Sequence, residues 1–162
     1  MKQTIVVVLS ILLFSACHSS KKVTIAPSSE DDTSVNTPSS KGVSFEDNKS
    51  LTLSTILEKA KTEHKLVFVD AYATWCAPCK LMEKEVFPNS ETGVYFNQNF
   101  ISYKLNVEKN NGPTVKLLYD ISVLPTLLFL DAEGNVLERA DNSITISELN
   151  NLAKKAVRGV KK

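Results

Sequence analysis

The stretch KLVFVDAYA, residues 65–73, places the strongest constraint on how this chain can fold. Its residues LVFV are consecutive and apolar, without the alternation of polar and apolar side chains that a half-exposed strand shows. Such a run is typical of a strand that is covered on both faces of its sheet. We therefore expect a central strand here, with other elements packed on both sides of it.

Signals for strands and helices alternate along the chain from about residue 43. Further strands are predicted at GVSFED as a short edge strand, at FISYKLNV, and on either side of the turn DAEGN. Helices are predicted in SLTLSTILEKAKTEHK with Ser50 as N-cap, in GPTVKLLYD with Pro113 in its first turn, and in TISELNNLAKKAV. This alternation predicts the α/β class, with a central mixed β-sheet flanked by helices on both faces.

Composition bounds the function more than the fold. The 162 residues are 43% apolar and 23% charged, which fits one globular domain with appendages. With 19 basic against 18 acidic residues the net charge is +1, whereas nucleic-acid-binding domains usually carry a strongly basic face. We therefore expect no nucleic acid among the partners.

The first residues are typical of an export signal. Lys2 precedes an apolar run from Ile5 to Phe14, and small residues follow before Cys17. A membrane-spanning helix needs about 20 apolar residues, roughly twice the length of this run, so a spanning segment is the less favoured alternative. We expect residues 1–16 to be a signal peptide that is removed on export.

Cys17 points to a lipid anchor. The motif FSAC resembles the bacterial lipobox, in which a cysteine after small residues is lipidated and becomes the mature N-terminus, although Phe14 stands where leucine is usual. A lipidated Cys17 would explain the odd number of cysteines in an exported protein, and a plain signal peptide is the alternative. Residues 17–42, rich in Ser, Thr, Pro and charge, then form a flexible tether, and residues 43–162 form the folded domain.

Cys76 and Cys79 could form a structural bridge, half of a metal site or a reactive pair. A disulfide that closes so short a loop constrains the unfolded chain little, which makes stability a weak reason for the pair. A structural zinc site needs four protein ligands, and the chain adds only His64 and His18. We expect no metal, and the reactive pair is the favoured interpretation.

The cysteines follow the central strand, where a helix is expected to begin. Roughly half a positive charge and unpaired backbone amides at a helix N-terminus stabilise a thiolate over a thiol. Cys76, nearer the helix start, is the predicted nucleophile, and Cys79, one turn inside, would attack the mixed disulfide that Cys76 forms with a substrate. Pro78 costs no hydrogen bond so close to a helix start.

From Leu66 to about Arg139 the chain resembles the thioredoxin family. WCAPCK differs at one position from the WCGPCK of thioredoxin. The segments VDAYATWCAPCKLMEKEVF, YKLNVEKNN and VLPTLLFLDAEGN are similar, in order and spacing, to the periplasmic thioredoxin-like domain of the reductant conductor DsbD and its lipoprotein relatives. The resemblance implies a thioredoxin fold for residues 43–162 and thiol-disulfide oxidoreductase activity without a cofactor.

The resemblance also assigns roles to two charged residues. In the family, a buried acid six positions before the first cysteine helps to move a proton to and from the inner cysteine. Here that acid is Asp70, which would serve Cys79. Lys104 matches the lysine that lies near this acid, and it would offset the several kcal/mol that burying an unpaired carboxylate costs. A plain ion pair without a catalytic role is the alternative.

Pro125 in VLPT matches the cis-proline that faces the cysteines in the family. The backbone of Leu124 would then pair with an extended substrate segment, a form of strand addition. Trp75 would cover one side of this binding site or, alternatively, pack in the core.

The sequence departs from the thioredoxin pattern at two places. Lys84 stands where thioredoxin itself has a proline that kinks the active-site helix, and VFPNSETG ends that helix in a turn instead. ERADNS lacks the glycine that commonly follows the last strand and helps to shape the substrate groove. The first departure favours the periplasmic relatives, and the second leaves the substrates open.

These features predict a membrane-anchored oxidoreductase that faces the periplasm and reduces or isomerises disulfides in exported proteins. Ala77-Pro78 and Asp70 favour reduction, and because that compartment is oxidising, the pair would need electrons from a membrane donor of the DsbD type. Cys17 would hold the protein in the lipid of the inner or the outer membrane. A non-catalytic binding or assembly adaptor of the same fold, with a static disulfide, is the competing hypothesis.

Overall fold

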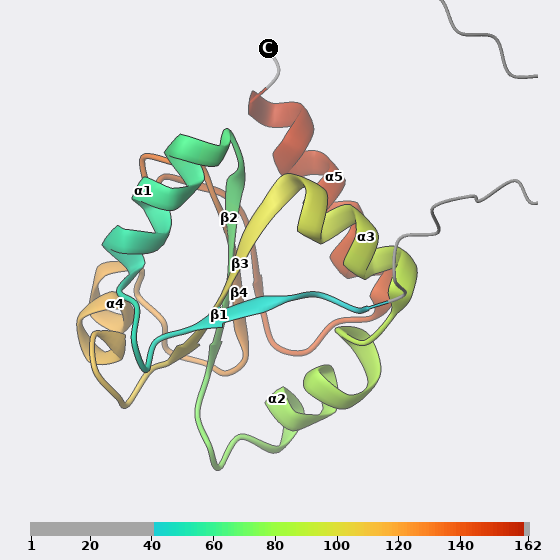
Figure 1. The fold of residues 1–162 in the computed structure, drawn as a ribbon. Helices are drawn as coiled ribbons and strands as arrows, with labels where there is room; N and C mark the ends of the chain where they lie inside the picture. The colour runs from blue at the N-terminus through green and yellow to red at the C-terminus, as the bar shows by residue number, and fades with distance from the viewer. Residues whose placement is uncertain (1–40, 161–162) are drawn as a thin grey trace, which may run out of the picture. The chain divides into compact units, whose positions relative to one another are not determined.

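The computed structural model of the protein describes residues 41–160 (Figure 1). Five strands form one sheet in the order β1-β3-β2-β4-β5. Strands β1 and β2 both run parallel to β3, whereas β4 runs antiparallel to β2 and β5 antiparallel to β4. The sheet is therefore mixed, as the sequence predicts. The strands are β1 (Phe45–Asp47), β2 (Leu66–Tyr72), β3 (Phe100–Asn106), β4 (Thr126–Leu130) and β5 (Val136–Asp141).

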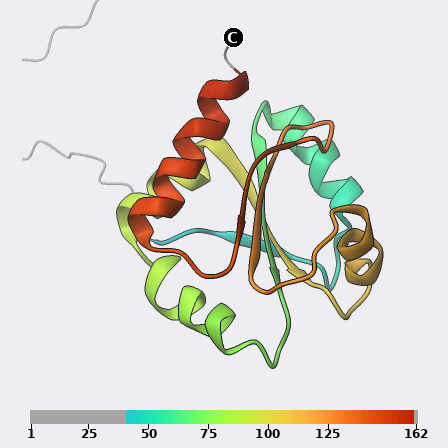
Figure 2. The same ribbon diagram turned by 180° about the vertical axis from the view of Figure 1, so that it is seen from behind.

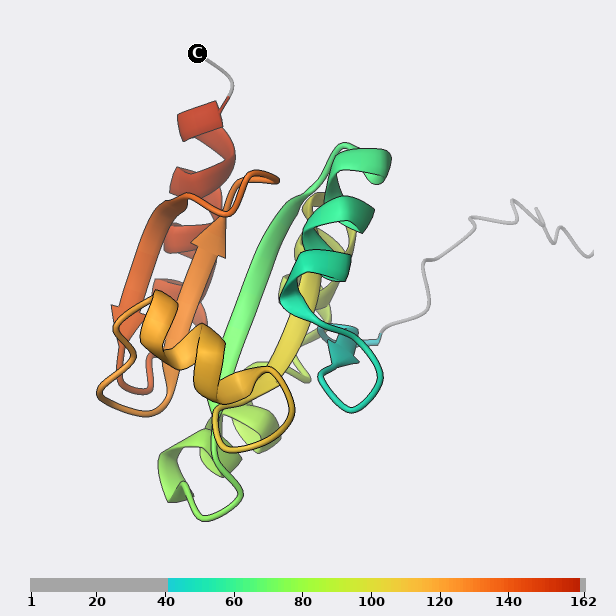
Figure 3. The same cartoon turned by 90° about the vertical axis from the view of Figure 1, so that its left-hand side faces the viewer.

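Helices cover both faces of this sheet, as the views in Figures 1, 2 and 3 show. Helices α1 (Leu53–Glu63) and α4 (Gly112–Leu118) lie on one face, and α3 (Ser90–Asn99) and α5 (Ile146–Val160) on the other. The short α2 (Ala77–Leu81) follows β2 and continues into a π-helical turn, η1 (Met82–Val86). Lys84 lies in η1, so this wider turn stands where thioredoxin itself has its proline. Turns of this kind are frequent at functional sites.

Alternate residues of β2 face the two helical layers. Val67, Val69 and Ala71 pack in the core beneath α1 and α4. Phe68 packs in the second core, where its ring centre lies 4.9 Å from that of Phe96 in α3. Successive side chains of a strand point to opposite faces, so a strand covered on both sides requires an apolar residue at each position. This requirement explains the unbroken LVFV run.

The first helix begins later than predicted. Its N-cap is Thr52 rather than Ser50, because the Thr52 hydroxyl accepts a hydrogen bond from the N–H of Thr55 at 3.3 Å. A side-chain acceptor at this position satisfies an amide that has no partner inside the helix.

Helix α3 was not predicted from the sequence. The segment VFPNSETG was expected to be the turn that ends the preceding helix, but the turn is shorter and a new helix begins at Ser90. Asn89 is its N-cap, since its Oδ1 accepts from the N–H of Thr92 at 2.9 Å.

The register of the sheet brings three separate segments together at one edge, the one formed by the carboxyl ends of β2 and β3 and the start of β4. Ala71 pairs with Thr126 across the antiparallel β2 and β4, and Tyr72 pairs with Asn106 across the parallel β2 and β3. The cysteine segment leaves β2 at this edge. It therefore starts beside Pro125, which precedes β4, and beside the loop that follows β3.

Candidate active site

Cys76 is the N-cap of α2, as the sequence predicts for a reactive pair. Its backbone is extended, and its Sγ accepts a hydrogen bond from the N–H of Cys79 at 3.2 Å. The two cysteines form a disulfide, with 5.4 Å between their Cα atoms. In the reduced protein the same amide and the helix N-terminus would stabilise a thiolate at Cys76.

Both cysteines are buried, each with 2% of its surface exposed. Exposure does not distinguish the two thiols. The assignment of Cys76 as the attacking thiol therefore rests on its place at the helix start, where the backbone amides can stabilise its anion.

Trp75 lies on the surface next to the buried pair. It is 67% exposed, which excludes the core-packing alternative. Its indole Nε1–H donates to Oε1 of Glu108 at 2.8 Å, so the loop after β3 fixes the ring. Glu108 was not predicted from the sequence, because no local pattern links it to a residue 33 positions earlier.

Asp70 and Lys104 are neighbours in register on β2 and β3. Lys104 Nζ lies 3.3 Å from Oδ2 of Asp70, whose side chain is completely buried. Burial raises the pKa of Asp70 to about 6, although the positive charge of Lys104 lowers it. A carboxyl with this pKa gains and loses its proton near neutral pH, which is what an acid that serves a thiol requires.

Within residues 41–160, neither oxygen of the Asp70 carboxylate accepts a well-directed hydrogen bond. The contact with Lys104 is therefore an ion pair. Buried polar atoms are usually hydrogen-bonded, and an unsatisfied one is costly. Asp70 is therefore a poor contributor to stability, and its environment suits proton transfer.

Lys104 also contacts an acidic and an aromatic side chain. Glu83 of η1 places its Oε1 3.1 Å from Lys104 Nζ, and the centre of the Tyr72 ring lies 4.7 Å from the same atom. A cavity of about 250 Å³ is lined in part by Glu83 and Lys104, so solvent reaches this side of the pair. The charge of Glu83 raises the pKa of Asp70. Glu83 was not predicted from the sequence, because its contact with Lys104 joins two distant segments of the chain.

The peptide bond between Leu124 and Pro125 is cis, in agreement with the resemblance. No hydrogen bond of the described chain uses the N–H or C=O of Leu124, so this backbone is free to pair with an extended segment. The Pro125 carbonyl accepts from the N–H of Asn142 at 2.9 Å. Asn142 follows β5 directly and has φ 100°, so an asparagine takes a backbone conformation that favours glycine.

The predicted signal peptide, the lipidation of Cys17 and nearly all of the predicted tether lie outside residues 41–160. Among the described helices none is both long enough and apolar enough to cross a bilayer. In the same part of the chain, no three His, Cys, Asp or Glu side chains are grouped as metal ligands.

Comparison with known sequences identifies the family. A family model described as Thioredoxin-like matches residues 47–132, just over half of the chain. Thioredoxin-T of Drosophila melanogaster is 37% identical over 76 residues, which make up 47% of this chain and 45% of that protein. The thiol:disulfide interchange protein DsbD of Tatumella citrea is 38% identical over 88 residues, 53% of this chain and 15% of that protein. The chain thus spans less than half the length of either relative.

Solved structures agree with the sequence comparison. A candidate disulphide-isomerase from Bacteroides thetaiotaomicron is 36% identical and matches with a TM-score of 0.62, over 76% of this chain and 97% of that one. The oxidised C-terminal domain of Neisseria meningitidis DsbD, 16% identical, shares the fold with a TM-score of 0.55, over 64% of this chain and 91% of that one. The chain therefore belongs to the thioredoxin-like family and has the thioredoxin fold.

Proposed function

We propose that this protein is anchored to a membrane, faces the periplasm, and reduces or isomerises disulfides in exported proteins. The observation that carries the proposal is the Cys76–Cys79 disulfide at the N-terminus of α2. The buried Asp70 and the unpaired backbone of Leu124 supply the two further functions that disulfide exchange needs, a proton acceptor and a site for an extended substrate segment.

The reductive reaction is proposed to proceed in two exchange steps. The Cys76 thiolate attacks one sulfur of the substrate disulfide, which forms a mixed disulfide and releases the other substrate sulfur as a thiolate that takes up a proton. Cys79 then gives its proton to Asp70 and attacks Sγ of Cys76. The second substrate sulfur leaves as a thiolate, the Cys76–Cys79 disulfide forms, and two electrons have passed to the substrate.

Continued turnover requires a donor that returns two electrons to the cysteine pair. We infer a membrane donor of the DsbD type, because the chain is similar to part of proteins that carry this name. A lipid on Cys17 would keep the enzyme at the surface where such a donor lies. Mass analysis of the mature N-terminus tests the anchor. A lipid-modified Cys17 supports it, and an unmodified or missing Cys17 contradicts it.

Insulin reduction in the presence of dithiothreitol tests the activity. We expect the wild-type protein to accelerate reduction and Cys76→Ser to abolish the acceleration. With insulin and no dithiothreitol, reduced Cys79→Ser should instead accumulate a mixed disulfide through Cys76, because the resolving thiol is missing, and later addition of dithiothreitol should release it. A wild-type rate no higher than that of Cys76→Ser would sink the proposal.

The second candidate is a binding or assembly adaptor with the same fold and a static disulfide. The low exposure of both cysteines favours it, since a substrate thiolate cannot easily reach them. The reduction potential of the pair separates the two functions. A structural disulfide has a potential below about −300 mV, whereas exchanging pairs lie roughly between −270 and −120 mV. The position within that second range also indicates whether the protein reduces, isomerises or oxidises its substrates.

A further inference from the structure

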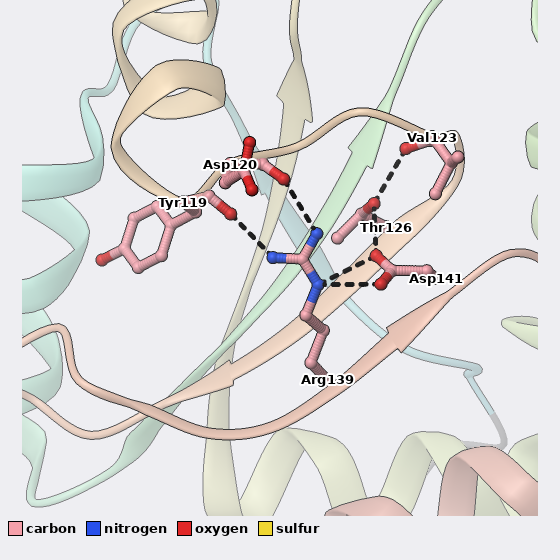
Figure 4. A network of polar contacts seen from close by, with 6 residues as sticks. All are labelled: Tyr119, Asp120, Val123, Thr126, Arg139 and Asp141. Atoms are coloured by element: carbon pink, nitrogen blue, oxygen red, sulfur yellow. Dashed lines mark hydrogen bonds and ion pairs between the residues drawn. The ribbon is translucent and has the colours of Figure 1, made fainter.

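We propose that Arg139 and Asp141 of β5 are positioning residues for substrate binding (Figure 4). They hold the loop of residues 119–125, between α4 and β4, in the shape that presents the Leu124 backbone to a substrate. The inference rests on the proposed function, because it assumes that an extended substrate segment pairs at Leu124.

The guanidinium of Arg139 holds the first part of the loop. Its Nη1–H donates to the carbonyl of Tyr119 at 2.7 Å, and its Nη2–H donates to the carbonyl of Asp120 at 3.1 Å. Tyr119 is the C-cap of α4, and Asp120 has φ 48°, so the chain turns away from the helix at these two residues. The last carbonyls of a helix lack partners within it, and the fixed fork of an arginine can satisfy two of them together.

Asp141 links the same guanidinium to the last part of the loop. The Nε–H of Arg139 donates to Oδ1 and Oδ2 of Asp141 at 2.9 and 3.1 Å. The Thr126 hydroxyl lies 3.1 Å from Asp141 Oδ1 and 2.8 Å from the carbonyl of Val123. A hydroxyl has one proton, and both of these partners are acceptors, so Thr126 shares its proton between β5 and the loop.

These contacts surround Leu124 without using it. Arg139 of β5 donates to the backbone carbonyls of Tyr119 and Asp120. The N–H of Asn142, directly after β5, donates to the carbonyl of Pro125, and the Thr126 hydroxyl bonds to that of Val123. The N–H and C=O of Leu124 have no hydrogen-bond partner within residues 41–160. The network therefore fixes the neighbours of Leu124 and leaves its own polar groups to a binding partner. A loop that is ordered before binding loses less conformational freedom when the partner arrives.

Stability alone is a weak reason for this network. The side chains of Arg139 and Asp141 are 28% and 43% exposed, and ion pairs near the surface contribute little to folding. Within residues 41–160, no hydrogen bond or ion pair joins either side chain to the cysteines or to Asp70. Their loss should therefore change how well a protein substrate binds and leave the chemistry of the cysteine pair unchanged.

The test compares Arg139→Leu with Arg158→Leu, which removes the same charge from the exposed last turn of α5. Both full-length variants and the wild type are assayed with insulin, a protein substrate, and with bis(2-hydroxyethyl) disulfide, a small one. We expect Arg139→Leu to raise the KM for insulin about tenfold at nearly constant kcat, because a misplaced loop weakens binding. Its rate with the small disulfide and the reduction potential of its cysteine pair should match the wild type. Arg139→Lys, which keeps the charge without the fork, should behave like Arg139→Leu.

An unchanged KM for insulin in Arg139→Leu, or an equal loss with both substrates, overturns the positioning role. The proposed function has its own criterion, which is insulin reduction by the wild-type protein. If the wild type is inactive, amide hydrogen exchange in residues 119–125 decides the positioning role alone. Faster exchange there in Arg139→Leu than in Arg158→Leu supports it, and equal exchange overturns it.

Discussion

Two ion pairs lie near the active site, and they differ in how their polar atoms are satisfied. Asp70 and Lys104 join β2 to β3, and the Asp70 carboxylate is buried without a well-directed hydrogen bond within residues 41–160. Arg139 and Asp141 both lie on β5, partly exposed, and each nitrogen of the arginine fork donates a hydrogen bond. A buried, poorly satisfied carboxyl favours a shifted pKa and proton exchange, whereas a fully bonded pair fixes geometry. The buried pair thus suits proton transfer, and the pair on β5 suits holding a loop in place.

Removal of Lys104 is expected to have the largest effect. Lys104→Met leaves the Asp70 carboxyl buried without its cation, and breaking a buried ion pair in this way costs about 3–5 kcal/mol. The loss should be larger at pH 8, where the carboxyl is ionised, than at pH 5, where a proton neutralises it. Urea unfolding at both pH values measures the difference. Equal losses at pH 5 and pH 8 would show that Lys104 does not offset the charge of Asp70.

Asp70→Asn should change how stability depends on pH. Because the pKa of Asp70 is raised in the folded protein to about 6, its contribution to stability is complete below about pH 4 and is lost as the pH rises through 6. A pKa raised from 3.8 to about 6 corresponds to about 3 kcal/mol. The free energy of unfolding of Asp70→Asn minus that of the wild type should therefore be larger at pH 8 than at pH 4 by about this amount.

Denaturant unfolding between pH 4 and pH 8 measures this slope. Glu58→Gln, which changes an exposed carboxyl of α1, is the matched control and should follow the wild type. A parallel pH dependence of Asp70→Asn and the wild type would mean that Asp70 titrates normally in the folded protein.

Arg139→Leu should have a smaller effect on stability than either change at the buried pair. We expect a loss of about 1 kcal/mol, because the lost hydrogen bonds are charge-assisted but partly exposed. The effect of Arg158→Leu should be near zero. Thermal and urea unfolding measure both, and added salt should reduce the loss in Arg139→Leu. A loss as large as that of Lys104→Met would remove the distinction between the two pairs.

Glu83→Gln is expected to have the smallest effect. Glu83 is 63% exposed, so its ion pair with Lys104 should contribute about 0.5 kcal/mol or less. Its negative charge raises the pKa of Asp70, so its removal should lower that pKa. The midpoint of the pH dependence of stability should then move to lower pH. A midpoint that stays in place or rises would argue against electrostatic coupling between Glu83 and Asp70.

The sequence predicts those elements that carry their own pattern of apolar residues. KLVFVDAYA, FISYKLNV and the closing helix all form where their apolar residues indicate. Helix α3 differs because its sequence is weakly amphipathic and includes Gly93. Its contacts come from distant segments, such as the packing of Phe96 against Phe68 and the hydrogen bond that Asn150 Nδ2 donates to Thr92 Oγ1 at 3.1 Å. Local patterns do not contain such contacts.

The residues of the site also fall into those that a local motif predicts and those that depend on contacts between distant segments. Asp70, Lys104 and Pro125 belong to motifs in fixed order around the cysteines, and the structure places the first two in contact. Arg139 acts on a carbonyl 20 positions earlier in the chain, and Glu83 reaches Lys104 from a π-helical turn. Neither contact follows from a local pattern, because each depends on how two distant segments are packed. The catalytic and binding roles of the motif residues stay predictions until the variants are measured.

The alternation of side chains along β2 limits where this chain can change its length. Phe68 and Asp70 share the face that carries α3 and α5, and Val69 and Ala71 lie on the opposite face. One residue inserted in β2 before Asp70 would turn its carboxyl toward α1 and reverse the apolar side chains of the strand. The turn of residues 131–135 joins β4 to β5 and can vary in length without such a reversal. Insertions are therefore expected to be tolerated at that turn and to abolish the site when they fall in β2.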